Sequence, residues 1–132
     1  MPIEDARLLK FYMENISKVI LGLRYKAHNV RVGTKTIDML CEDKSNHPVI
    51  VQIQRGRATL KTIKRVRQYQ FAYAQEKGVW PKAVIIATGW SLVAAEDAKM
   101  YDIQLVRHPE EARPLLKWFW RKARAQDSDY AR

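Results

Sequence analysis

The pattern of hydrophobic and polar positions divides the first half of the chain into one helix and three strands. Residues 2–23 carry apolar side chains at helical spacing, which predicts an amphipathic helix. Three β-rich runs follow at residues 25–32, 36–41 and 48–54, and turn-forming residues separate them. Short turns between successive strands predict an antiparallel meander.

The second half alternates helices with strands. Residues 58–76 predict a helix, and residues 82–88 form a short apolar run typical of a buried strand. A helix over residues 91–101, with Ser91 as its N-cap, and a strand over residues 103–106 complete the pattern. The helix over 58–76 is expected to bury one face, formed by Leu60, Ile63, Val66, Gln70, Tyr73 and Ala74.

A β-α-β passage after a meander predicts the α/β class, with a central mixed β-sheet flanked by helices. We expect residues 1–108 to form one domain. Residues 109–132 form a C-terminal aromatic and basic segment, in which a last helical region opens at Pro109 and is interrupted by Pro114.

Composition limits the classes of protein that fit. The 132 residues suit one domain, and no apolar run is long enough to span a membrane. Acidic residues precede the first apolar run, so no secretory signal is expected. Cys41 is the single cysteine, which excludes an internal disulfide and fits a reducing compartment. We therefore expect a cytoplasmic protein.

The charge balance points to a polyanionic partner. The chain has 24 Lys and Arg against 14 Asp and Glu, a net charge of +10. No acidic residue occurs between Lys44 and Gln75, where several cations gather. Such clustering favours nucleic acid, whereas a solvated basic face without a specific partner is the simpler alternative. The cations expected to hold phosphates are Arg55, Arg57, Lys61, Lys64, Arg65 and Arg67.

The two strands over 36–41 and 48–54 carry the polar positions that are candidates for chemistry. Gln52 follows Asp38 by 14 positions, and Gln54 follows two later. On paired neighbouring strands, Asp38 and Gln52 can point to the same end of the sheet, and Gln52 and Gln54 share one face. Two carboxylates and a lysine so placed would bind Mg²⁺ and orient a water on a phosphodiester.

The order of segments resembles a nuclease family. A helix, a strand, TIDMLCED, a turn, VIVQIQRGRA, a basic helix ending in RQYQFAY, and KAVIIAT follow one another. This layout is similar to the catalytic domain of the NucS (EndoMS) type of endonuclease, in the RecB-like branch of the PD-(D/E)XK superfamily. The resemblance implies a restriction-endonuclease-like sandwich and metal-dependent hydrolysis of DNA.

The resemblance also assigns roles to single positions. The family aspartate matches Asp38, its tyrosine matches Tyr69, and its upstream acid falls nearest Asp5. Three polar positions depart from the pattern, because Gln52 stands for the glutamate, Gln54 for the lysine and Arg65 for the glutamine.

These departures weaken the expected metal site. Gln52 offers a neutral oxygen, and Gln54 supplies no positive charge to an attacking water or a developing phosphorane. Arg65 adds a cation that opposes Mg²⁺ and favours a phosphate. The leading hypothesis is a DNA-binding protein that has lost catalysis and needs no cofactor.

Other interpretations stay open. An active endonuclease would use Mg²⁺ or Mn²⁺ at Asp38, helped by Asp5. A third hypothesis is an assembly subunit that binds an acidic protein partner. Asp38 could instead cap backbone N–H groups, and Tyr69 could simply pack against the sheet. No membrane partner is expected.

The histidines and a cluster of aromatic residues near the C-terminus are two further groups with potential functions. His28, His47 and His108 lack the spacing of zinc ligands. Trp118, Phe119 and Trp120 span too wide an arc for one buried helix face. They could cap the sheet core or stack on bases beside neighbouring cations, but a homodimer interface is the favoured function of this segment.

Overall fold

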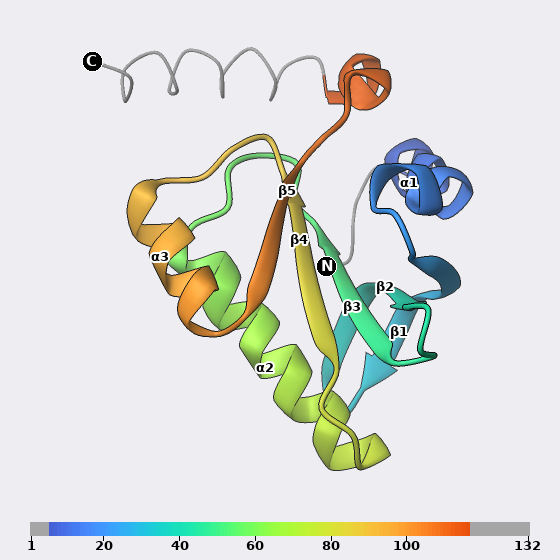
Figure 1. Cartoon of the computed structure of the whole chain (residues 1–132), viewed down its shortest axis with the longest axis vertical. Coiled ribbons are helices and arrows are strands. Elements are labelled where there is room, and N and C mark those ends of the chain that lie inside the picture. Colours follow the sequence, from blue (N-terminus) through green and yellow to red (C-terminus); the bar gives the residue numbers. More distant parts are fainter. Residues whose placement is uncertain (1–5, 117–132) are drawn as a thin grey trace.

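Five strands form one twisted sheet in the order β1-β2-β3-β4-β5 (Figure 1). The computed structural model describes residues 6–116, so the predictions for Asp5 and for residues 117–132, including the aromatic trio and its homodimer, lie outside it. The strands are β1 (Arg24–Val32), β2 (Lys35–Glu42), β3 (Pro48–Ile53), β4 (Lys82–Ala87) and β5 (Ile103–Arg107).

The sheet is mixed, as the sequence predicts. β1, β2 and β3 run antiparallel, whereas β3, β4 and β5 run parallel. The antiparallel part follows from short polar turns. In one of them, the Asp43 carboxylate accepts the backbone N–H groups of Ser45 and His47. Each parallel step contains a helix, because parallel neighbours need a crossover connection.

Helices cover both faces of the sheet. Figure 1 shows α2 (Leu60–Lys77) and α3 (Leu92–Met100) on one face and α1 (Ala6–Val19) on the other. The 3₁₀ helix η1 (Glu110–Leu116) packs on the α1 side, where Ala112 and Leu116 join its core. None of these described helices is long and apolar enough to cross a membrane.

Two apolar cores lie on opposite faces of the sheet. On the α1 face, the side chains of Leu8, Tyr12 and Ile16 pack against Met39 and Val51. On the other face, α2 and α3 pack on a second cluster of buried residues from the sheet. Since β3 and β4 are covered on both faces, they are almost continuously apolar.

One local prediction is wrong, and the helical region predicted after Pro109 is present as a helix of a different type. Leu60, expected on the buried face of α2, is 49% exposed because it lies in the first turn, beside the N-cap. The helical region that opens at Pro109 is a 3₁₀ helix as far as Leu116. Pro114 lies inside it and has no N–H to donate, which disfavours continuous α-helical bonding.

The start of α2 depends on a reciprocal cap. The Thr59 hydroxyl accepts the backbone N–H of Thr62, while the Thr59 N–H donates to the Thr62 hydroxyl at 3.0 Å. Thr59→Ala removes one of these bonds and should lower the free energy of unfolding by about 1 kcal/mol. Thermal unfolding followed by circular dichroism should then show a melting temperature lower by about 4 °C.

Thr59→Ser is the matched control, because serine keeps the capping hydroxyl. If the alanine variant melts at the same temperature as the serine variant, the cap does not stabilise the helix.

Candidate functional site

The register of β2 and β3 brings Asp38 and Gln52 together. Met39 pairs with Val51, and the same register places Asp38 opposite Gln52. Both side chains are buried, with exposed fractions of 4% and 6%. The Asp38 carboxylate accepts the backbone N–H of Ile53 at 3.0 Å. Asp38 therefore has the backbone-capping role that the sequence left open, whatever other role it has.

Gln52 has a buried oxygen that no group satisfies. Its Oε1 atom has no hydrogen-bond partner among residues 6–116. Buried polar atoms without a partner are rare, because each loses its hydration without compensation. The amide oxygen next to the Asp38 carboxylate is therefore available to accept from a ligand or to bind a cation.

The side chain of Gln54 is used within the chain. Its Nε2 atom donates to the carbonyl oxygen of Arg57 at 3.3 Å, in the loop that follows β3. Its backbone N–H donates to Ile86 at 2.8 Å, and its carbonyl accepts from His108 Nε2 at 2.7 Å. The residue after β3 is thus held by β4 on one side and by the segment after β5 on the other. The neutral amide of Gln54 supplies no positive charge to the site.

His108 anchors this strand end from a distant part of the sequence. Its ring is buried and lies between the Gln54 carbonyl and the hydroxyl of Tyr12 in α1. A carbonyl can only accept, so Nε2 carries the proton and Nδ1 accepts from Tyr12. Burial lowers the pKa of His108 to about 4, which keeps the imidazole neutral at neutral pH. Histidine spacing in the sequence gives no indication of this role.

Tyr69 of α2 lies within electrostatic reach of the Asp38 site. Its side chain is half-buried, and burial raises the pKa of its hydroxyl. The negative charge of Asp38 raises this pKa further, whereas the positive charge of Arg65 lowers it. The register thus pairs Asp38 with Gln52, and the charges of Asp38 and Arg65 both act on Tyr69.

The six cations predicted to hold phosphates lie on two segments of the chain. Arg55 and Arg57 are half-buried in the loop after β3, whereas Lys61, Lys64 and Arg65 are exposed on α2. The guanidinium of Arg67 lies 3.5 Å from the centre of the Tyr101 ring. Lys64 and Arg67 line a cleft on α2, whereas the charge of Arg65 acts on Tyr69.

Among residues 6–116, the side chains beside Asp38 do not fit a dedicated magnesium site. Across residues 6–116, no group of three or more His, Cys, Asp or Glu side chains could hold a metal ion. The donors beside each other are one carboxylate, from Asp38, and one neutral amide oxygen, from Gln52. Mg²⁺ binds through hard oxygens and usually keeps several waters and substrate phosphates.

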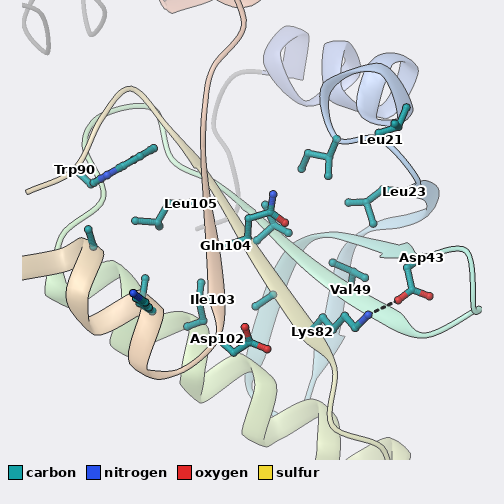
Figure 2. Close-up of a pocket in the computed structure, with 16 residues that line it drawn as sticks. Leu21, Leu23, Asp43, Val49, Lys82, Trp90, Asp102, Ile103, Gln104 and Leu105 are labelled. Carbon is teal, nitrogen blue, oxygen red and sulfur yellow. Dashed lines mark hydrogen bonds and ion pairs between the residues drawn. The ribbon is translucent and has the colours of Figure 1, made fainter. Parts of the chain in front are cut away.

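A pocket lies away from the Asp38 site, near the amino ends of the parallel strands. Figure 2 shows this pocket of about 740 Å³ near the amino ends of β3, β4 and β5, with the Asp43–Lys82 ion pair of 2.7 Å at its margin. The bond from Lys82 and those from backbone N–H groups lower the pKa of Asp43 to about 2. No predicted site residue lines this pocket, so the candidate site is the one at Asp38.

The fold and the position of the site define the class. A five-stranded mixed sheet between helices, with polar motif positions paired on two neighbouring strands, is a restriction-endonuclease-like α/β sandwich. The family model of the endonuclease NucS C-terminal domain matches residues 4–110. The chain belongs to this family, which confirms the resemblance in the sequence. A comparison with curated proteins gives no match.

Solved structures support the same fold. An EndoMS complex with double-stranded DNA is 17% identical, with a TM-score of 0.71 over 78% of this chain and 43% of its own. A repair endonuclease from Pyrococcus abyssi is 14% identical, with a TM-score of 0.71 over 82% of this chain and 49% of its own. The chain thus spans less than half the length of these structures, and at this identity they establish the fold alone.

The buried His108 should make stability depend on pH. The unfolded chain binds this proton near pH 6.5, whereas the folded chain binds it only near pH 4. Between these values the unfolded state holds more protons, so stability decreases as pH falls from about 6.5 to about 4. The loss should reach about 3 kcal/mol, measured by urea unfolding at several pH values.

His108→Gln is the matched variant, because its amide can donate to the Gln54 carbonyl but does not titrate. It should be less stable at pH 7 and show a flatter profile over this window. Asp43 titrates near pH 2, outside the window. A wild-type profile as flat as that of the variant would contradict the assignment.

Proposed function

We propose that this protein is a DNA-binding member of the NucS C-terminal domain family that has lost catalysis. The observation that carries the proposal is the pairing of Asp38 with Gln52, where two carboxylates would be needed to concentrate a divalent cation. Gln54, at the position of the expected lysine, donates to Arg57 instead. The strand pairing that positions the site matches the expected pattern, but the neutral Gln52 and Gln54 stand where a glutamate and a lysine are expected.

Binding to DNA is supported by charge, exposure and family. The net charge is +10, and Lys61 and Arg65 are exposed on α2. Arg65 acts electrostatically in the same neighbourhood as Asp38, where it disfavours a metal ion and suits a phosphate oxygen. A similar solved structure is a complex of EndoMS with double-stranded DNA. The backbone phosphates are the expected ligand of this surface.

A metal-dependent endonuclease is the second candidate function. The observation in its favour is the unsatisfied Gln52 Oε1 atom opposite Asp38, since an amide oxygen is a weak but real ligand for hard cations. Such an enzyme would use Mg²⁺ or Mn²⁺, and Asp38→Ala would abolish its cleavage of DNA.

Restoring the charged residues should separate the two functions. We expect the wild-type chain to leave supercoiled plasmid intact in Mn²⁺, because one carboxylate and one amide cannot hold the ion. Gln52→Glu combined with Gln54→Lys supplies the second carboxylate and the cation, and should give nicked and linear plasmid. Gel electrophoresis with increasing time measures both products.

Asp38→Ala in the double variant is the control and should remove any gained cleavage. Cleavage by the wild-type chain that Asp38→Ala abolishes would contradict the loss of catalysis. Cleavage that survives Asp38→Ala in either background would place the active site elsewhere.

Salt dependence should test the phosphate contacts. Binding to a short DNA duplex should weaken linearly as log salt increases, because each neutralised phosphate releases counterions. Lys61→Ala combined with Arg65→Ala should reduce the slope by about 2 and weaken binding to all sequences alike. Fluorescence anisotropy at several salt concentrations measures this slope.

Lys18→Ala is the matched control, because Lys18 is an exposed lysine at the end of α1. Its slope should equal that of the wild-type chain. Binding that does not change with salt, or equal slopes for the double variant and the control, would contradict the proposed interface.

A further inference from the structure

A cleft of about 730 Å³ lies between the β1–β2 turn and the outer side of α2. Its volume falls within the range of about 300–1,000 Å³ that is usual for ligand pockets. The turn contributes Gly33, Thr34 and Lys35. The remaining lining residues come from α2 and the loop after it: Lys64, Arg67, Gln68, Phe71, Ala72, Gln75 and Trp80.

Two large aromatic side chains are exposed in this cleft. Phe71 is 58% exposed and Trp80 is 50% exposed. The backbone of Trp80 is anchored, since its carbonyl interacts with His47 Nε2 at 2.9 Å. Lys64, Gln68, Phe71 and Gln75 follow one another at helical spacing, so one side of α2 presents them together. Grouped exposed apolar side chains with a polar rim mark a site of association.

The rim of the cleft is positively charged. Lys35, Lys64 and Arg67 line it, and none of the described lining residues is acidic. Stacking on Tyr101 holds the Arg67 guanidinium 3.5 Å from the ring centre. An occupant therefore needs negative charge around an apolar or aromatic group.

This cleft does not belong to the Asp38 site. Phe71 follows Tyr69 by two residues, which places their side chains about 200° apart around the helix. Tyr69 responds to the charge of Asp38, whereas Phe71 faces the cleft. The part of α2 that faces the cleft therefore differs from the part that carries Tyr69.

We propose that the cleft binds a short acidic segment of a partner protein, with an aromatic or large aliphatic side chain as its anchor. The anchor contacts Phe71 and Trp80, and the flanking carboxylates face Lys35 and Lys64. From Lys64 to Gln75 the helix rises about 16 Å, which about five extended residues span. This activity goes beyond the proposed DNA binding and does not depend on it.

The aromatic floor favours a peptide over a nucleic acid. A buried anchor side chain surrounded by complementary charge is the usual arrangement of a peptide site. A nucleic-acid strand would need a continuous basic track, whereas Ala72, Gln68 and Gln75 interrupt the cations here. The two classes of occupant predict different losses when the aromatic residues are removed.

The test is a selection of random twelve-residue peptides displayed on phage, with the immobilised full chain as the target. Selected peptides should contain Asp or Glu around at least one aromatic or leucine residue. The best of them is then synthesised with a fluorescent label. Phe71→Ala combined with Trp80→Ala should weaken its binding at least about tenfold in fluorescence anisotropy, as expected when interface anchors are truncated.

Leu92→Ala combined with Met100→Ala is the matched control, because it removes two exposed apolar side chains from α3, outside the cleft. It should leave peptide affinity unchanged, and both double variants should bind a DNA duplex like the wild-type chain. Failure to select acidic peptides, or equal peptide affinity for the two double variants, would overturn the proposal. A tenfold loss of affinity for a single- or double-stranded oligonucleotide in the cleft variant would assign the cleft to nucleic acid instead.

Discussion

The hydrogen bond between the Ile53 N–H and the Asp38 carboxylate, 3.0 Å long, is the contact on which the candidate site depends. It joins β2 to β3 where their regular pairing ends at Met39 and Val51. The residue after Ile53 is held as well, by Ile86 on one side and by His108 on the other. A strand end would otherwise fray, and these three bonds keep the positions after it in one geometry. Gln52 therefore stays opposite Asp38 even though it contributes no charge.

The backbone contacts at the site fix its shape independently of the charges that its side chains carry. Catalysis by a metal ion needs a concentrated negative charge, which a single buried carboxylate beside a neutral amide does not provide. Binding of a phosphate needs the opposite field, and Arg65 supplies positive charge close to the same place. The backbone bonds of Asp38 do not depend on a metal. The strand pair therefore keeps its geometry whether or not a metal ion is bound.

The sequence was sufficient for most of the fold because local rules determine it. The β-branched runs and polar turns predicted the strands, and the helical spacing predicted the helices. Gln52 follows Asp38 by 14 positions, and this separation predicted that the two side chains lie together on paired strands. The contact of Tyr12 with His108 joins residues 96 apart, so no local pattern could indicate it. The prediction for Leu60 was wrong because helical spacing shows which face a residue shares but not how close it lies to the start of the helix. The cleft on α2 was missed because it needs the β1–β2 turn to lie against that helix.

The two sides of α2 can change independently, and this follows from how the helix is buried. Its inner face, with Ile63, Val66 and Tyr73, is fixed by packing on the sheet. Tyr69 lies beside this face and responds to the charges of Arg65 and Asp38, whereas Phe71 lies about 200° from Tyr69. A substitution at Phe71 therefore alters neither the packing of α2 on the sheet nor the charges that act on Tyr69. A helix that is fixed by its inner face can therefore carry different side chains along its two exposed flanks without a change in its position on the sheet.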